Sequence, residues 1–273
     1  MNTEIETKYQ LRITSADLTG NITAHLKELA EATDNARLSD EMRGYLETYS
    51  RFHQYSIGNV WCILMTYPQA TVVAGFNKWR SLNRFVKKGE KGIPILAPLL
   101  CKEEPDNVNS KTILRGFKVV YVFDVSQTEG EPLPEPPNWK SPEQNLLLFT
   151  RLVTFAEGRD ISVTIRELAG ETQGVSRGGA IEIDPSAGTK TLIHEIAHEL
   201  MHRGDDRPIS ATIRELEAES VAWVVGRHFG LDELSSPNYI ALHGATSEMI
   251  MAHLERIGLC ARQIIEAIEV ITE

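Results

Sequence analysis

The chain has 273 residues, 42% of them hydrophobic, and a formal net charge of −10 at pH 7. This length and composition are those of an ordinary soluble globular protein with one large or two modest domains. Its three cysteines form no Cys-x-x-Cys pair, which argues against a disulfide framework and a structural zinc knuckle. No stretch approaches the roughly 18 apolar residues of a membrane span, and the first residues lack the basic and apolar segments of an export signal. We therefore expect a cytoplasmic protein without a membrane partner.

The net charge hides an asymmetry between the two halves of the chain. Residues 1–140 carry 17 Lys or Arg and 17 Asp or Glu, whereas residues 141–273 carry 11 and 21. Basic residues of the first half are concentrated in the segment 78–91, where only Glu90 opposes them. The two halves are therefore expected to face different partners.

In chain order, the first half begins with predicted helices and continues with strands. Apolar residues recur at helical spacing in three segments, 16–33, 40–53 and 57–67. Short β-branched or aromatic runs, bounded by glycine-rich or acidic turns, predict strands at 85–86, 93–96 and 117–123. Five prolines in residues 129–142 forbid a helix there and favour an extended linker, where we place a domain boundary.

The second half mixes helices with short strands, so that the whole chain is predicted to be α+β. Helical patterns occupy three segments, 143–157, 190–203 and 213–225. Strands are predicted at 161–165 and 180–184. Beyond Gly230, an apolar stripe predicts one or two closing helices.

The sequence His194-Glu195-Ile196-Ala197-His198 is the most informative motif in the chain. In a helix its two histidines lie four residues apart on one face, so both rings can reach one metal ion. Glu195 then lies beside the ion, where it can take a proton from a water molecule as a general base. The flanking Leu192 and Ile193 predict a buried helix, in which polar groups need a function. A chance match to this short pattern is the alternative, and a hydrolase is the leading hypothesis.

A catalytic zinc ion takes three protein ligands, so the third must come from another element. The next predicted helix carries Glu215, Glu217 and Glu219 within an apolar pattern. Glu215 and Glu219 share a face, and Glu217 points away from them. His202, eight positions after His194, is a weaker candidate that we interpret as a histidine behind the ligands or at the surface.

These carboxylates after the His-Glu-x-x-His motif resemble the glutamate helix of gluzincin-type metallopeptidases. The resemblance implies that Glu215 binds Zn²⁺ together with His194 and His198, and that Glu219 orients a ligand. Another divalent ion such as Mn²⁺ is an alternative. A metzincin site would need glycine at position 201 and histidine at position 204, where this chain has methionine and glycine.

Two further features of the second half bear on substrate binding. Tyr239 and His243 are polar and lie downstream of the metal motif, so they are candidates for stabilising an oxyanion, with a structural role as the alternative for each. The strand at 180–184 runs up to the metal helix. A zincin-like domain would use such a strand to hold a substrate backbone by edge addition.

Cations and aromatic rings interleave in the first half. We predict DNA contacts at seven residues: Lys78, Trp79, Arg80, Arg84, Lys87, Lys88 and Lys91. Cations that follow phosphates, beside rings that stack on bases, are the two parts of a single-strand nucleic-acid site. The alternative is that Trp79 and Phe85 belong to the core and the lysines to a solvated turn.

A family resemblance is carried by four segments in order, 55–59, 70–79, 86–98 and 122–128. They resemble the N-terminal domain of ArdC-type antirestriction proteins, which binds single-stranded DNA and precedes a zincin-like metallopeptidase domain. The resemblance implies a helical and small-sheet DNA-binding domain, a proline-rich linker and a metallopeptidase domain, with limits 1–128, 129–142 and 143–273. Relatives often have a Trp- and Pro-containing segment before the first helix, whereas residues 1–40 contain neither.

The function that this resemblance implies is antirestriction. The protein would bind single-stranded DNA, act as a zinc-dependent peptidase on a protein or peptide such as a host restriction component, and protect mobile DNA from host restriction. Two alternatives stay open: a non-catalytic DNA-binding protein with a structural metal domain, and a regulatory metallopeptidase that cleaves a repressor. The presence of Glu195 beside the ligands counts against an inert metal domain.

Overall fold

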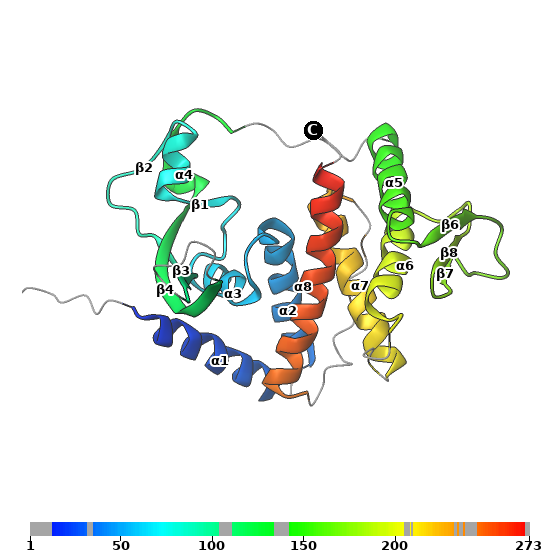
Figure 1. Cartoon of the computed structure of the whole chain (residues 1–273), viewed down its shortest axis with the longest axis horizontal. Helices are drawn as coiled ribbons and strands as arrows, with labels where there is room; N and C mark the ends of the chain where they lie inside the picture. The colour runs from blue at the N-terminus through cyan, green and yellow to red at the C-terminus, as the bar shows by residue number, and fades with distance from the viewer. Residues whose placement is uncertain are drawn as a thin grey trace, which may run out of the picture.

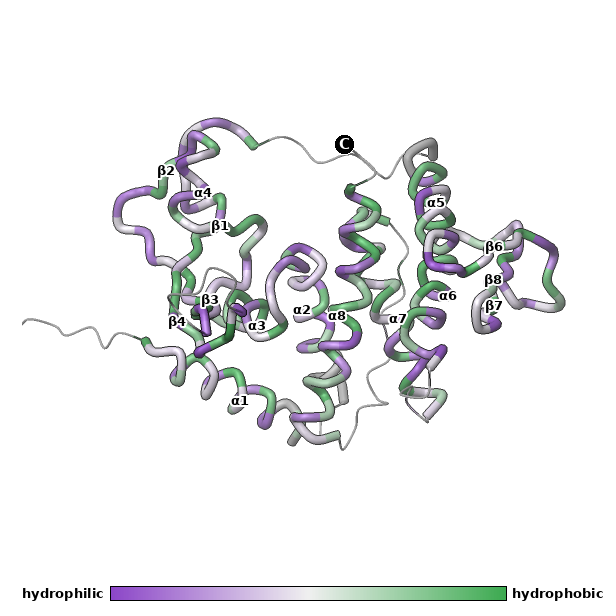
Figure 2. Tube along the Cα trace, viewed as in Figure 1, coloured by the Kyte–Doolittle hydropathy of each residue, from purple (hydrophilic) through white to green (hydrophobic). Residues whose placement is uncertain are grey.

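The computed structural model describes residues 13–31, 35–103, 111–133, 142–204, 208, 210–231, 234, 237 and 245–270. Helices and short sheets are both present, so the predicted α+β class is confirmed. Figure 1 shows a layered arrangement, with strands at both ends and a set of helices between them. Figure 2 shows that hydrophobic and hydrophilic residues alternate along the helices. None of the described helices combines the length and apolarity needed to cross a bilayer.

The first half begins with the three predicted helices, α1 (Ser15–Glu31), α2 (Asn35–Phe52) and α3 (Ile57–Thr66). Short elements and a long hairpin follow, β1 (Val73–Gly75), α4 (Phe76–Ser81), β2 (Arg84–Val86), β3 (Ile93–Lys102), β4 (Thr112–Asp124), the 3-10 turn η1 (Val125–Gln127) and β5 (Thr128–Gly130). Strands β1, β4 and β3 form an antiparallel sheet in that order, and β2 pairs with β5. Elements β1, α4 and β5 are too short for the spacing of apolar residues to predict them from the sequence.

The second half contains α5 (Pro142–Glu157), β6 (Ser162–Ile165), β7 (Gly174–Ser176), β8 (Ala180–Ile183), α6 (Thr189–Met201), α7 (Ala211–His228) and α8 (Ser247–Val270). The sheet order is β6-β8-β7, with β6 parallel and β7 antiparallel to β8. The strand that leads into α6 is therefore the central one, and both of its edges are paired. The expectation that this strand adds a substrate at its edge is wrong, and the edge strand beside α6 is β7.

Buried residues from both halves form one continuous core. Helix α2 packs on α7, and α1 and α3 contact α8. Glu47 of α2 accepts hydrogen bonds of 2.8 and 2.6 Å from the guanidinium of Arg227 on α7, and the carbonyl oxygen of Ser50 lies 2.9 Å from Nδ1 of His228. Residues 134–141 of the predicted linker lie outside the described residues, so the domain limits stay a prediction.

A buried histidine lies at this contact between the halves. His53, directly after α2, is 3% exposed, and its ring centre lies 4.8 Å from that of His228. Neither ring nitrogen of His53 has a hydrogen-bond partner within the described part of the chain. Burial, with a contribution from the neighbouring His228, lowers the pKa of His53 to about 4. The folded protein therefore holds this ring uncharged.

The pH dependence of stability tests this assignment. An unfolded chain holds histidine at a pKa of about 6.5, so the unfolded state takes up the proton first as the pH falls. The stability that uncharged His53 contributes is complete above that pH and is lost progressively toward pH 4. Chemical denaturation at a series of pH values measures the free energy of unfolding. Between about pH 6.5 and pH 4 this free energy should fall by up to about 3 kcal/mol more in wild type than in His53→Gln. Parallel curves for the two proteins would contradict the assignment.

Candidate metal centre

Two helices bring the predicted ligands together. The inner face of α6 is fully buried, with Leu192, Ile193 and Ile196 at 0% exposure, and it packs closely along α7. Helix α7 begins at Ser210, whose hydroxyl oxygen accepts the backbone N–H of Ile213. This start places the second turn of α7, which carries Glu215, opposite the motif on α6.

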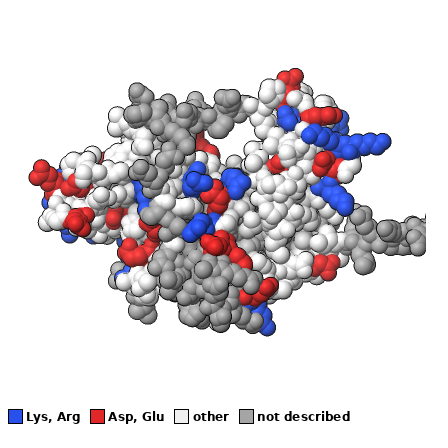
Figure 3. Space-filling view, turned by 180° about the vertical axis from the view of Figure 1, so that it is seen from behind, with Lys and Arg blue, Asp and Glu red and all other residues white. Residues whose placement is uncertain are grey.

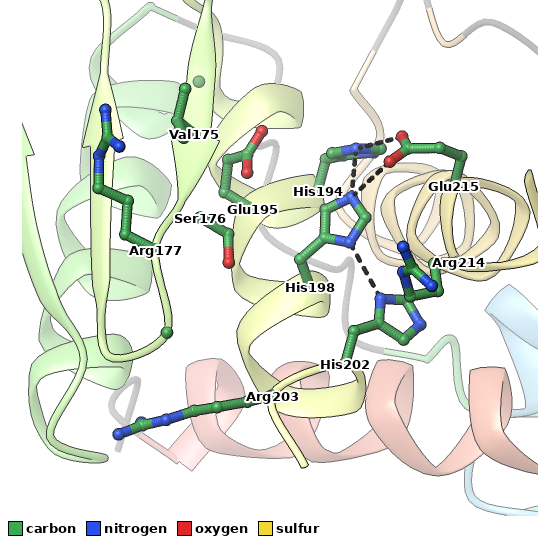
Figure 4. Close-up of a pocket in the computed structure, with 12 residues that line it drawn as sticks. Val175, Ser176, Arg177, His194, Glu195, His198, His202, Arg203, Arg214 and Glu215 are labelled. Carbon is green, nitrogen blue, oxygen red and sulfur yellow. Dashed lines mark hydrogen bonds and ion pairs between the residues drawn. The ribbon is translucent and has the colours of Figure 1, made fainter. Parts of the chain in front are cut away.

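The three side chains converge in the geometry of a metal site. Nε2 of His194 lies 3.0 Å from Nε2 of His198. The carboxylate of Glu215 is 3.3 Å from the first nitrogen and 3.4 Å from the second, and all three ligand atoms lie within 4.8 Å of one another. Figure 4 shows them pointing toward one another. Ligands about 2.0–2.1 Å from a tetrahedral zinc ion are about 3.3 Å apart, so the donors fit one ion.

The electrostatics of the cluster favour a positive charge. Burial alone would lower the pKa of His194, but the carboxylates of Glu215 and Glu219 raise it to about 9. In return, hydrogen bonds from His194 and His198 hold the pKa of Glu215 well below its usual range. Without an ion, Nε2 of His194 and Nε2 of His198 face each other. A cation between these groups would give both nitrogens a partner.

Each ligand histidine has a partner behind it. Oε2 of Glu219 lies 3.4 Å from Nδ1 of His194, which is where the gluzincin resemblance expects a supporting carboxylate. Nδ1 of His198 lies 2.9 Å from Nδ1 of His202, so His202 stands behind the site and not among its ligand atoms. Glu217 points away from the ligands, as its spacing predicts, and contacts the far side of His202 at 2.9 Å.

Glu217 is surrounded by donors that the sequence does not reveal. It is completely buried, and its Oε1 lies 2.7 Å from Nδ1 of His253 and 3.1 Å from Nε of Arg256, both on α8. Burial would raise the pKa of Glu217, but His202, His253 and Arg256 lower it to about 2. Helix α8 is distant in sequence, so no local spacing links these residues to the motif.

Glu195 lies under the edge strand β7. Its side chain is buried, and this burial raises the pKa of the carboxyl group. A Cβ atom at Gly174 would come within 2.8 Å of Cγ of Glu195, so only glycine lets the strand pass this close. Figure 4 shows Glu195 on the side of the histidines that faces β7. The general-base candidate is therefore held between the metal ligands and a strand.

A second glutamate of α6, Glu199, fixes the turn between β7 and β8. Its buried carboxylate accepts hydrogen bonds from the hydroxyl of Ser176 at 2.6 Å and from the backbone N–H groups of Gly178 and Gly179 at 2.7 and 2.6 Å. Both glycines have positive φ angles, which suits a tight turn. Sequence reasoning missed Glu199, although its spacing of four from Glu195 and the glycine pair are signals of this contact.

A cleft of about 600 Å³ opens over the cluster and is lined by β7, α6 and the start of α7. Arg214 also lines it, next to Glu215, and donates a hydrogen bond to the carbonyl oxygen of Pro208 at 2.7 Å. Arg214 was not a predicted site residue. The predicted oxyanion candidates Tyr239 and His243 lie outside the described residues.

Trp79 is not at the surface of the first half. Its side chain is 0% exposed, and its indole N–H donates to the carbonyl oxygen of Phe123 on β4 at 2.9 Å. The guanidinium carbon of Arg84 lies 6.0 Å from the ring centre. The prediction that Trp79 stacks on a DNA base is wrong, because α4 packs this ring into the interior of the domain.

The predicted basic residues differ in their accessibility. Four are exposed and have room for a ligand: Lys78, Arg80, Lys88 and Lys91. Lys87 is also exposed, but its Nζ donates to the carbonyl oxygen of Ser126 at 2.8 Å. Arg84 is partly buried and ties β2 to β5 through Thr128, with bonds of 2.9 and 3.3 Å. Arg84 is therefore part of the scaffold.

Exposed aromatic rings lie around these cations. Phe76, Phe85 and Tyr121 are 49%, 53% and 44% exposed. Figure 3 shows Lys and Arg gathering at the corner that α4 and β2 form. The loop before β3 is held in place because the side-chain amide of Gln127 donates to Glu90 and to the carbonyl oxygen of Lys91, both at 2.9 Å. Exposed cations and exposed rings therefore both occur in the first half, and Phe85 and Tyr121 are exposed where Trp79 is not.

Comparison with known proteins finds a similarity in the first half of the chain. Residues 14–126 match the family model described as the N-terminal domain of anti-restriction factor ArdC. This match lies within the first half of the chain, and it supports for that half the resemblance seen in the sequence.

The individual proteins that resemble this chain share little sequence identity with it. An uncharacterized pXO2 protein of Bacillus anthracis is 25% identical over 270 residues, covering 79% of this chain and 45% of that protein. The chain thus spans less than half the length of this curated relative. The crystal structure of antirestriction ArdC protein from the R388 plasmid is 18% identical, with a TM-score of 0.48, in a metal-free form covering 78% of this chain and 85% of that one. Its Mn(II)-bound form has the same identity and TM-score, with coverages of 82% and 97%.

Metal content tests the ligand set. Purified wild type is expected to bind about one divalent ion per chain, and Glu215→Ala should weaken binding strongly, because two remaining ligands do not hold the geometry. Elemental analysis and chelator competition measure both effects. Glu171→Ala, an exposed carboxylate outside the cluster, is the matched control. Unchanged affinity in Glu215→Ala would remove this residue from the site.

Proposed function

We propose that this protein is an antirestriction factor that combines a metal-dependent peptidase site with a surface for single-stranded DNA. The observation that carries the peptidase part is the convergence of His194, His198 and Glu215 within 4.8 Å, beside a buried glutamate and an open cleft. Two imidazoles and one carboxylate are a donor set of catalytic zinc sites, and Mn²⁺ also accepts these donors. The ion, when bound, supplies Lewis acidity that polarises a substrate carbonyl.

The chain itself supplies the proton transfer. Glu195 is buried beside the ligands, and its raised pKa brings a carboxylate closer to the range in which it can both accept and return a proton. In peptide hydrolysis it would take a proton from the attacking water and deliver it to the leaving amide nitrogen. The position of Glu195 between the ligands and β7 supports this role.

The cleft offers a place for an extended peptide. Among the described residues, strand β7 pairs with β8 on one side only, and its residues Gly174, Val175 and Ser176 line the cleft. A peptide that lies along the free edge would gain backbone hydrogen bonds and pass over the metal site. Glu199 keeps this edge in place through the turn at Gly178.

A catalytic-site variant separates a peptidase from a non-catalytic DNA-binding protein. Glu195→Gln keeps the shape of the side chain but removes the proton acceptor, so it should retain the metal and lose protection of incoming DNA in a restriction-proficient host. Transfer efficiency of unmodified DNA measures protection, and elemental analysis checks metal retention. Full protection by Glu195→Gln would favour the non-catalytic alternative and overturn the peptidase proposal.

The DNA-binding part rests on the ArdC-type domain and on its exposed cations and rings. Reversing the charge of Lys88 and Lys91 should weaken binding to single-stranded DNA and reduce the slope of log affinity against log salt by about 0.7 for each phosphate that the protein no longer neutralises. Phe85→Ala should cost about 1 to 3 kcal/mol of binding if the ring stacks on a base. Fluorescence anisotropy at several salt concentrations measures both effects.

Two controls make this test specific. Lys27→Glu changes the charge of an exposed residue on α1, outside the basic segment 78–91. It should leave the slope of log affinity against log salt unchanged. Trp79→Ala should lower the melting temperature of the protein, since it removes a buried ring. Wild-type affinity after the double charge reversal would show that DNA binds elsewhere.

A further inference from the structure

We propose that His202 and Glu217 act as positioning residues that fix the tautomer and orientation of His198 in the metal site. This inference rests on the proposed metal site and adds to it two residues that lie behind the ligand His198 and are not among the ligand atoms. Its basis is a continuous chain of contacts from a completely buried carboxylate to a metal ligand.

The chain of contacts has three members and two short links. Nδ1 of His198 lies 2.9 Å from Nδ1 of His202, and Nε2 of His202 lies 2.9 Å from Oε2 of Glu217. The side chain of His202 is only 4% exposed and that of Glu217 is 0% exposed. Within this shielded environment each ring nitrogen must act as a donor or an acceptor toward its neighbour.

The donor directions follow from Glu217. An ionised carboxylate only accepts hydrogen bonds, so His202 donates from Nε2, and as a neutral imidazole, which carries one ring proton, it presents a lone pair at Nδ1. That lone pair accepts the Nδ1 proton of His198. The proton of His198 is thereby kept on Nδ1, and the lone pair of Nε2 faces His194 and Glu215. This is the tautomer that a metal ligand needs.

The ionised state of Glu217 is secured from a third helix. Arg256 is always charged and donates to Oε1 of Glu217 from Nε at 3.1 Å. It also donates from Nη2 to the carbonyl oxygen of Met201 at 2.9 Å, at the end of α6. Helix α8 therefore holds both the carboxylate and the end of the helix that carries the histidines.

The two ligand histidines differ in how they are supported. The carboxylate of Glu219 contacts His194 directly, with Oε2 3.4 Å from Nδ1. His198 instead reaches its carboxylate through an interposed histidine in the interior. Residues behind a ligand of this kind typically change metal affinity about 10- to 100-fold when they are removed.

The isosteric substitution Glu217→Gln can reverse which atoms donate and which accept between Glu217, His202 and His198, and it leaves no cavity in the core. In Glu217→Gln, the amide oxygen must stay opposite Arg256, because that residue only donates. The amide NH₂ then faces His202 and donates to its Nε2. His202 would carry its proton on Nδ1, facing the Nδ1 proton of His198. The ligand-competent tautomer of His198 is thereby disfavoured.

The experiment compares three variants of the full chain by chelator competition with Zn²⁺ and Mn²⁺. Glu217→Gln and His202→Leu should each weaken metal binding about 10- to 100-fold. His202→Gln should stay within a few-fold of wild type, since its amide oxygen can accept from His198 while its NH₂ donates to Glu217. Rescue by this conservative variant is the readout that a merely structural role would not give.

Imidazole ¹⁵N NMR supplies a second measurement that does not depend on metal binding. Metal-free wild type should show the Nδ1-protonated tautomer of His198, and Glu217→Gln should shift it toward the other tautomer. Unchanged metal affinity in both His202→Leu and Glu217→Gln would overturn the positioning role, as would an unchanged tautomer in Glu217→Gln. Wild type that binds no metal, or Glu215→Ala that binds normally, would instead overturn the metal site itself.

Discussion

The packing of α6 against α7 is the contact on which the site depends. It brings a carboxylate from one helix against two imidazoles on the other, with nitrogen and oxygen atoms 3.3 and 3.4 Å apart. Apolar burial drives the association, since Ile193, Ile196 and Val221 are completely buried along it. Because the ligands come from two helices and not from one loop, any shift between the helices changes the ligand spacing directly.

Helix α7 also joins the two halves of the molecule. Its first turns carry Glu215 and Glu217 at the predicted metal site, whereas its last turn carries Arg227 and His228, which contact α2 in the first half. One helix of 18 residues therefore connects α2 of the first half with the predicted metal site of the second half. Buried residues of both halves form one continuous core, so the two halves pack directly against each other.

The sequence predicted what is local and missed what depends on tertiary packing. The long helices and the spacing of His194 and His198 follow from periodicity, because these features lie within one element. Trp79 shows the limit of such reasoning, since an aromatic residue among lysines suggests a binding surface until the packing of α4 on β4 buries it. His253 and Arg256 could not be predicted, because they reach Glu217 only through the fold of α8 onto α7.

The composition suggests an acidic surface on the second half, but in the structure some of its acidic residues are buried. Three of its glutamates, Glu195, Glu199 and Glu217, are buried, and each has a role near the cluster as general-base candidate, anchor of the β7–β8 turn or support behind His202. Burying a carboxylate is costly unless donors or cations compensate it. Part of the negative charge therefore lies inside the protein, where hydrogen-bond donors such as the N–H of Gly178 and the guanidinium of Arg256 compensate it, and not at the surface.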